Sequence, residues 1–155
     1  PDEAHHLILK PTTDYPGKEI FPSEVADAII TETGCHPFLV QAVCSALITL
    51  LNVERREQAT PEDIAQVREK VLEGWGSYFA NLWNRTSREQ RVCLEALLAL
   101  PQAGIERLAE RTQMTEKGVR QTLQLLLRRD LVLRNQDEVY SIAVPLFRRW
   151  LERTI

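Results

Sequence analysis

The stretch IERLAERTQMTEKGVRQTLQLLLRRDLVLRNQDEVYSI, residues 105–142, contains a change of hydrophobic period that decides the fold. Its first part predicts a short helix carrying Leu108, and Thr115 stands where it can cap a longer helix whose apolar residues recur every three or four positions. After Leu131 the apolar residues alternate, on both sides of a polar turn at residues 135–137. We therefore expect a helix, a turn, a longer helix and a β-hairpin in that order.

The residues on either side extend this pattern to a complete domain. Thr86 and Glu89 have the spacing of a capping box and precede an apolar helical stripe, while Pro145 can begin a last amphipathic helix. Helix, short helix, turn, longer helix and hairpin are the order of a winged helix-turn-helix with a β-hairpin wing. The sequence predicts this domain over residues 76–155.

The residues before this domain predict a small helical bundle over residues 20–75, which makes the chain mainly α. A helix that follows Pro22 is expected to stop at Gly34, and Pro37 suits the first turn of a second helix. Thr60 can cap a third helix that ends near a break at residues 74–77. Residues 1–19 contain Pro11, Pro16 and Gly17, and we expect a loop-like linker there.

Composition bounds the class of protein. The chain has 155 residues, of which 44% are hydrophobic and 26% charged, and this is typical of a globular protein. Its apolar runs at residues 46–51 and 94–100 are too short to cross a bilayer, and three widely spaced cysteines suit reduced thiols. We expect a cytoplasmic protein without a membrane segment, cut from a longer chain because it begins with Pro. Residues 1–85 hold 7 Lys/Arg against 13 Asp/Glu, whereas residues 86–155 hold 12 against 9.

The segment Thr33-Gly34-Cys35-His36-Pro37-Phe38-Leu39-Val40-Gln41 resembles the lid region of STAND and AAA-like signalling ATPases, which carry Gly-x-His-Pro-aromatic-Leu-x-Gln at this helix junction. Residues 9–11, 78–83 and 145–151 resemble the flanking parts of the same region. The resemblance implies a regulatory, signal-transducing piece in which Gly34, His36 and Pro37 lie nearest to ATP or ADP held by an N-terminal nucleotide-binding core. An equal interpretation, from the residues alone, is that Gly34 only ends one helix, Pro37 only begins the next and His36 lies on the surface.

This chain departs from the ATPase pattern in what it lacks. It contains no Gly-x-x-x-x-Gly-Lys-Ser/Thr phosphate loop and no strand ending in paired acids for magnesium. We therefore expect no cofactor in this chain and no catalysis by it alone, with ATP or ADP bound by the missing core. A Cys–His nucleophile or a zinc site is not supported, because no productive spacing of Cys35, Cys44 or Cys93 with a histidine is present.

DNA binding is the alternative function. The longer helix of a helix-turn-helix enters the major groove, and arginine and glutamine are base-reading side chains. The candidate contacts to DNA or to a protein partner are Lys117, Arg120, Gln121 and Gln124. Glu116 and the acidic hairpin tip at residues 135–138 argue against DNA binding, because their negative charges repel phosphates. The arginines at 128, 129, 148, 149 and 153 suit either a solvated face or a protein-docking surface.

Overall fold

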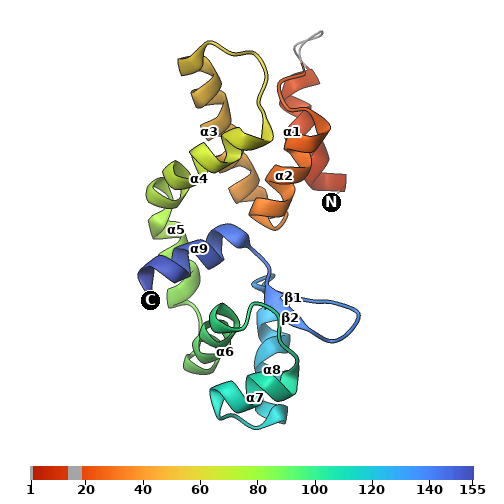
Figure 1. Ribbon diagram of the computed structural model, residues 1–155, viewed down its shortest axis with the longest axis vertical. Helices are drawn as coiled ribbons and strands as arrows, with labels where there is room; N and C mark the ends of the chain where they lie inside the picture. The colour runs from red at the N-terminus through yellow and green to blue at the C-terminus, as the bar shows by residue number, and fades with distance from the viewer. Residues whose placement is uncertain (1, 14–18) are drawn as a thin grey trace. The chain divides into compact units, whose positions relative to one another are not determined.

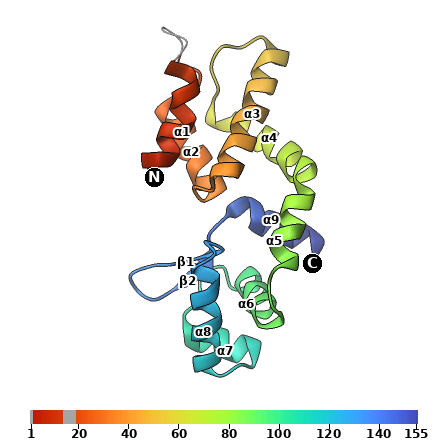
Figure 2. The ribbon, with the colours of Figure 1, turned by 180° about the vertical axis from the view of Figure 1, so that it is seen from behind.

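The computed structural model describes residues 2–13 and 19–155, with side chains described for residues 2–8 and 19–155. These described residues are mainly helical, with 70% helix in nine helices and one two-stranded antiparallel sheet (Figures 1 and 2). The chain divides into two compact units, unit 1 at Pro1–Ser77 and unit 2 at Tyr78–Ile155. Unit 1 holds 6 Lys/Arg against 13 Asp/Glu and unit 2 holds 13 against 9, so the two units carry charge of opposite sign.

Unit 1 begins with a helix where the sequence predicted a loop. The helix α1 spans Asp2–Thr13 and packs against its neighbours α2 and α3. Ala4 and Ile8 are buried, and His5 Nε2 lies 2.8 Å from Asp27 Oδ1. The prediction of a loop-like segment at residues 1–19 was therefore wrong for residues 2–13, because tertiary packing outweighed the helix-breaking signal of Pro11. Residues 1 and 14–18, which include Pro16 and Gly17, lie outside the described part.

Three further helices complete unit 1 as the period of the sequence predicted. They are α2 (Ser23–Thr33), α3 (Pro37–Glu54) and α4 (Pro61–Gly74). Their apolar faces form the core, with Val25, Ile29, Leu39, Val43, Leu47, Leu51, Ile64, Val67 and Val71 buried. Gly34 ends α2 in a left-handed conformation and Pro37 opens α3, so both predicted helix boundaries are confirmed.

The helix α3 is the most apolar element of the chain. Its 18 residues have a mean hydropathy of 1.5, which is long and apolar enough, by length and composition alone, to cross a membrane. The sequence prediction placed a helix here but considered only shorter apolar runs as possible membrane segments. A core helix passes the same test, and α3 packs against α1, α2 and α4.

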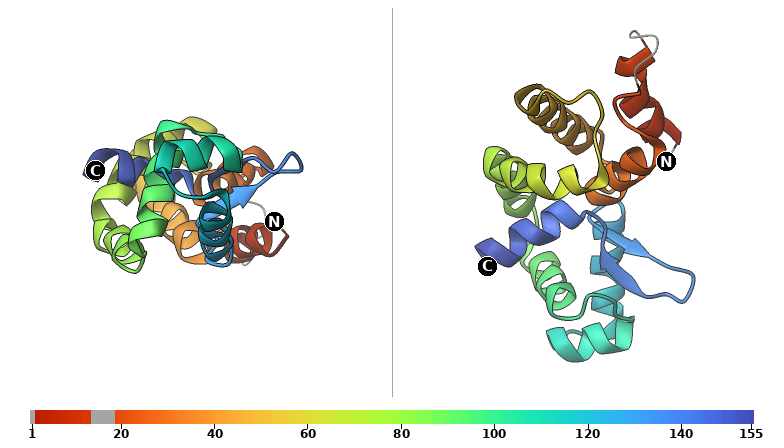
Figure 3. Two further views of the ribbon diagram at one scale, coloured as in Figure 1. Left: turned by 90° about the horizontal axis from the view of Figure 1, so that it is seen from below. Right: turned by 45° about the horizontal axis from the view of Figure 1, so that its top comes forward.

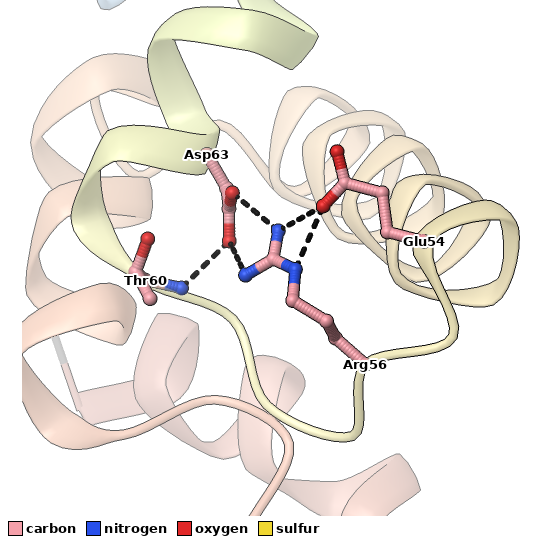
Figure 4. Close-up of polar contacts among 4 residues, drawn as sticks. All are labelled: Glu54, Arg56, Thr60 and Asp63. Carbon is pink, nitrogen blue, oxygen red and sulfur yellow. Dashed lines mark hydrogen bonds and ion pairs between the residues drawn. The ribbon is translucent and has the colours of Figure 1, made fainter.

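An arginine closes the loop between α3 and α4 (Figure 4). Arg56 donates from Nη2 to Asp63 Oδ1 at 2.6 Å and from Nη1 to Asp63 Oδ2 at 3.0 Å, and its Nε donates to Glu54 Oε2 at 2.7 Å. Asp63 Oδ2 also accepts from Thr60 N at 2.8 Å, within the capping box that opens α4. The hydrogen bonds from Arg56, more than any other contact, lower the pKa of Asp63.

Unit 2 is built on helices α5 (Gly76–Asn84), α6 (Arg88–Ala99), α7 (Ile105–Thr112), α8 (Glu116–Leu127) and α9 (Pro145–Thr154). The strands β1 (Val132–Arg134) and β2 (Tyr140–Ile142) form the β-hairpin that the alternating pattern predicted (Figure 3). Leu133 pairs with Ser141 in its antiparallel register. Phe79 of α5 stacks on Phe147 and Trp150 of α9, with ring centroids 6.3 and 6.2 Å apart.

Two local boundaries in this region differ from the sequence prediction. The capping box of α6 pairs Ser87 with Gln90, one residue later than the predicted pair of Thr86 and Glu89. Thr86 instead donates from Oγ1 to Trp83 O at 2.6 Å. The predicted break at residues 74–77 is a single non-helical residue, Trp75, between α4 and α5.

Candidate functional site

The junction between α2 and α3 holds the three residues that the sequence placed nearest to a nucleotide. Gly34 has φ 59° and ψ 33°, and the next residue, Cys35, has φ 61°. Their amides close the end of α2, because Gly34 N donates to Thr31 O at 3.4 Å and Cys35 N to Ile30 O at 3.2 Å. A left-handed non-glycine residue is uncommon and costs conformational energy. Sequence reasoning missed Cys35, since side-chain type alone does not report φ.

The start of α3 presents backbone donors at this junction. His36 is the N-cap and Pro37 the first helical residue; the His36 side chain makes no capping hydrogen bond to the helix, and the first turn contains no acid. The N–H groups at a helix N-terminus carry partial positive charge and favour anions or polar ligand edges. Gly34, His36 and Pro37 are thus brought together at an accessible turn, and their closeness to a nucleotide stays a prediction.

The surroundings of the junction are apolar and aromatic. Glu3, Ala4 and Leu7 of α1, with Cys35 and Pro37, line a pocket of about 290 Å³. Phe38 and Trp75 form a T-shaped pair with ring centroids 4.7 Å apart, and they are 38% and 37% exposed. Large aromatic rings that stay accessible are suited to packing against another surface.

The second predicted site is the exposed face of α8. Val119, Leu123 and Leu126 are buried on one side of this helix, and the four predicted contact residues are exposed on the other, namely Lys117, Arg120, Gln121 and Gln124. Thr115 caps the helix by accepting from Gly118 N at 3.1 Å, as the sequence predicted. Contact of the four exposed residues with DNA or with a protein stays a prediction.

Carboxylates surround the N-terminal end of α8. A groove of about 380 Å³ lies between the starts of α7 and α8 and the hairpin tip, and its charged lining comprises Glu106, Arg107, Glu116, Arg120, Asp137 and Glu138. Four acids against two arginines repel phosphate, so this end of the helix is a poor surface for a DNA backbone.

The thiols and acids offer little for nucleophilic or metal chemistry. Burial raises the pKa of Cys44 to about 12 and that of Cys93 to about 11, so both remain protonated at neutral pH. No group of three His, Cys, Asp or Glu side chains within the described ranges could hold a metal ion.

Comparison with known proteins gives a distant structural likeness. No protein-family model matches the chain, and no curated protein matches it. Among solved structures it is similar to a mutant of RuvB from Thermotoga maritima, with 12% sequence identity and a TM-score of 0.41, over 99% of this chain and 49% of that chain. The chain thus spans about half the length of that structure. The likeness is too distant to identify a family or an activity.

Proposed function

We propose that this chain is the C-terminal regulatory part of a cytoplasmic STAND or AAA-like signalling ATPase, in which unit 1 is the lid and unit 2 a winged helix. It is not catalytic alone and couples the nucleotide state of an N-terminal core of the same protein to a partner-binding surface on unit 2. The observation that carries this proposal is the α2–α3 junction. There the Gly-x-His-Pro segment forms a turn of two left-handed residues and a helix N-terminus to which the His36 side chain makes no capping hydrogen bond.

The physical basis is a differential contact. A lid shifts an equilibrium between two states only if it binds ATP-loaded and ADP-loaded cores with different free energy. The α3 N-terminus supplies such a contact, because its N–H groups and the positive end of the helix respond to the phosphate charge of the nucleotide. The order of helices and hairpin in unit 2 supports a winged helix. In this proposal the winged helix moves with the lid as a rigid body.

The test uses the full gene product beside this chain. We expect the chain alone to release no phosphate from ATP, while the full product hydrolyses it. His36→Ala in the full product should change the ratio of ATP to ADP affinity by about fivefold or more, the usual range of coupling between sites. Lys70→Ala, at an exposed position of α4, is the matched control and should leave the ratio unchanged. Hydrolysis by the chain alone, or a full product that binds no nucleotide, would contradict the proposal.

A second candidate function is DNA binding through α8, favoured by the exposure of Lys117, Arg120 and Gln124 on one face. It is tested by titrating duplex DNA at low salt against the chain and a variant with these three residues changed to Ala. Binding that is lost in the variant and weakens with salt supports a transcriptional role. Absence of binding at low salt leaves unit 2 as a protein-binding module.

A further inference from the structure

We infer that unit 2 binds an acidic segment of a partner protein through an arginine patch at the far end of α8 from the groove described above. The patch consists of Arg85, Arg88, Arg128 and Arg129. Arg85 begins the α5–α6 connection, Arg88 begins α6, and the other two follow α8. The inference concerns unit 2 alone and goes beyond the proposed coupling to a nucleotide.

The geometry of Arg129 joins these segments into one surface. Its Nη1 donates to Arg85 O and to Gln90 Oε1, both at 3.1 Å, and its Nη2 donates to Leu82 O at 3.3 Å. These acceptors are neutral, so they orient the guanidinium without compensating its charge. Burial makes the largest contribution to lowering the pKa of Arg129, and the positive charge of the nearby Arg85 lowers it further.

The four positive charges of the patch exceed the two negative charges that adjoin it in sequence. Among the described residues, none of its four arginines forms an ion pair with a carboxylate. Glu89 and Asp130 adjoin the patch in sequence. Glu89 accepts from Ser87 Oγ at 2.9 Å, and hydrogen bonds from its own backbone and from Ser87, with a further contribution from the charge of Arg88, lower its pKa. Beside the patch, Arg91 lies over the Trp83 ring at 5.0 Å and donates to Trp83 O at 3.3 Å. Fixed arginines beside a tryptophan are typical of energetically important positions in protein interfaces.

An acidic peptide segment fits this surface better than nucleic acid does. The 12 residues of α8 separate the patch from the acidic groove by about 18 Å, at 1.5 Å per residue. A stiff duplex on the patch would carry its phosphates toward the four carboxylates of the groove, whereas a short flexible segment contacts the patch alone. Arginine also binds carboxylates in unit 1, where Arg68 Nε lies 2.6 Å from Glu32 Oε1.

The experiment measures binding of a fluorescent peptide of ten alternating Glu and Asp residues by anisotropy at low salt. The patch variant Arg85→Ala/Arg88→Ala/Arg128→Ala removes three exposed arginines and leaves Arg129 in place. The control Arg107→Ala/Arg111→Ala/Arg149→Ala removes three exposed positive charges of unit 2 that lie outside the patch. We expect a loss of affinity of about tenfold in the patch variant and less than twofold in the control.

Several outcomes would overturn the inference. They are no binding at low salt, equal losses in the two variants, or tighter binding of a duplex DNA that the patch variant abolishes. Self-association of the chain that the patch variant abolishes would assign the patch to a second copy, with its acidic unit 1, and would also overturn it. Because no nucleotide is involved, each result is separate from the test of the ATPase proposal.

Discussion

The starts of α4 and α6 use the same arrangement of three residues with one chemical difference. In unit 1, Asp63 accepts from the backbone N–H of the N-cap Thr60 and from Arg56. In unit 2, Gln90 accepts from the backbone N–H of the N-cap Ser87, at 3.1 Å, and from Arg129, at 3.1 Å. Each arginine joins the capped helix to another segment, but only the first meets a carboxylate.

Because of this difference, the charge of Arg56 is compensated by a carboxylate inside its unit, whereas the charge of Arg129 is not. Asp63 is 2% exposed, and its charge and that of Arg56 compensate each other inside unit 1. The amide of Gln90 holds Arg129 in place and leaves its positive charge for the surface. One arginine therefore contributes mainly to folding, whereas the other contributes to both folding and the arginine patch.

The largest expected effect is that of Arg56→Ala. It leaves the buried carboxylate of Asp63 without its counterion, so the unfolding free energy of unit 1 should fall. Hydrogen exchange resolved by segment should show faster exchange in unit 1 and none of this change in unit 2. Lys70→Ala is the control and should stay within about 0.5 kcal/mol.

Asp63→Asn makes the first arrangement resemble the second, and we expect a loss of about 1.5 kcal/mol in unit 1 at neutral pH because an ion pair becomes a neutral hydrogen bond. The pKa of Asp63 is lowered in the folded state, so its stabilisation is complete above the unfolded pKa of about 3.9 and is lost as pH falls through the lower folded pKa. Unfolding free energies measured from pH 7 down to pH 2 should fall less steeply for the variant. Parallel curves for the two proteins would show that Asp63 does not carry the acid sensitivity.

Local signals in the sequence predicted most helices and the hairpin, but they failed where contacts between distant residues determine the local structure. Both Thr86-x-x-Glu89 and Ser87-x-x-Gln90 fit a capping box. The structure uses the second, in which Gln90 also accepts from an arginine 39 residues away. No local pattern contains that partner.

The candidate site also contains features that local sequence signals predicted and features that they did not. Gly34 and Pro37 act as helix end and helix start, as turn chemistry predicted, and the exposed face of α8 follows from its period. The left-handed conformation of Cys35 was not predictable, because φ depends on the folded backbone. The sequence marked Arg128 and Arg129 as a solvated face or a docking surface, but their grouping with Arg85 depends on a hydrogen bond between distant segments.

Gln90→Glu makes the second arrangement resemble the first. A carboxylate opposite Arg129 compensates its charge, so the acidic decapeptide should bind about threefold more weakly. The stability of unit 2 should change by less than about 1 kcal/mol, because the charge-assisted bond is offset by burying a carboxylate at a position that is 8% exposed. Gln121→Glu adds the same charge on the exposed face of α8 and should leave peptide affinity unchanged. Equal losses in the two variants would mean that total charge, and not Arg129, governs binding.

The smallest expected effect is that of Ser87→Ala. It removes the 3.3 Å hydrogen bond from Gln90 N to Ser87 Oγ but keeps the Ser87 backbone N–H and Arg129 as donors to Gln90 Oε1. Because those two bonds still hold the start of α6, the loss should lie near the low end of the usual range for an N-cap, about 0.5 kcal/mol. Amide exchange should quicken in the first turn of α6, with peptide affinity unchanged. Weaker peptide binding in this variant would show that the N-cap hydroxyl, and not the Gln90 amide, positions the arginine patch.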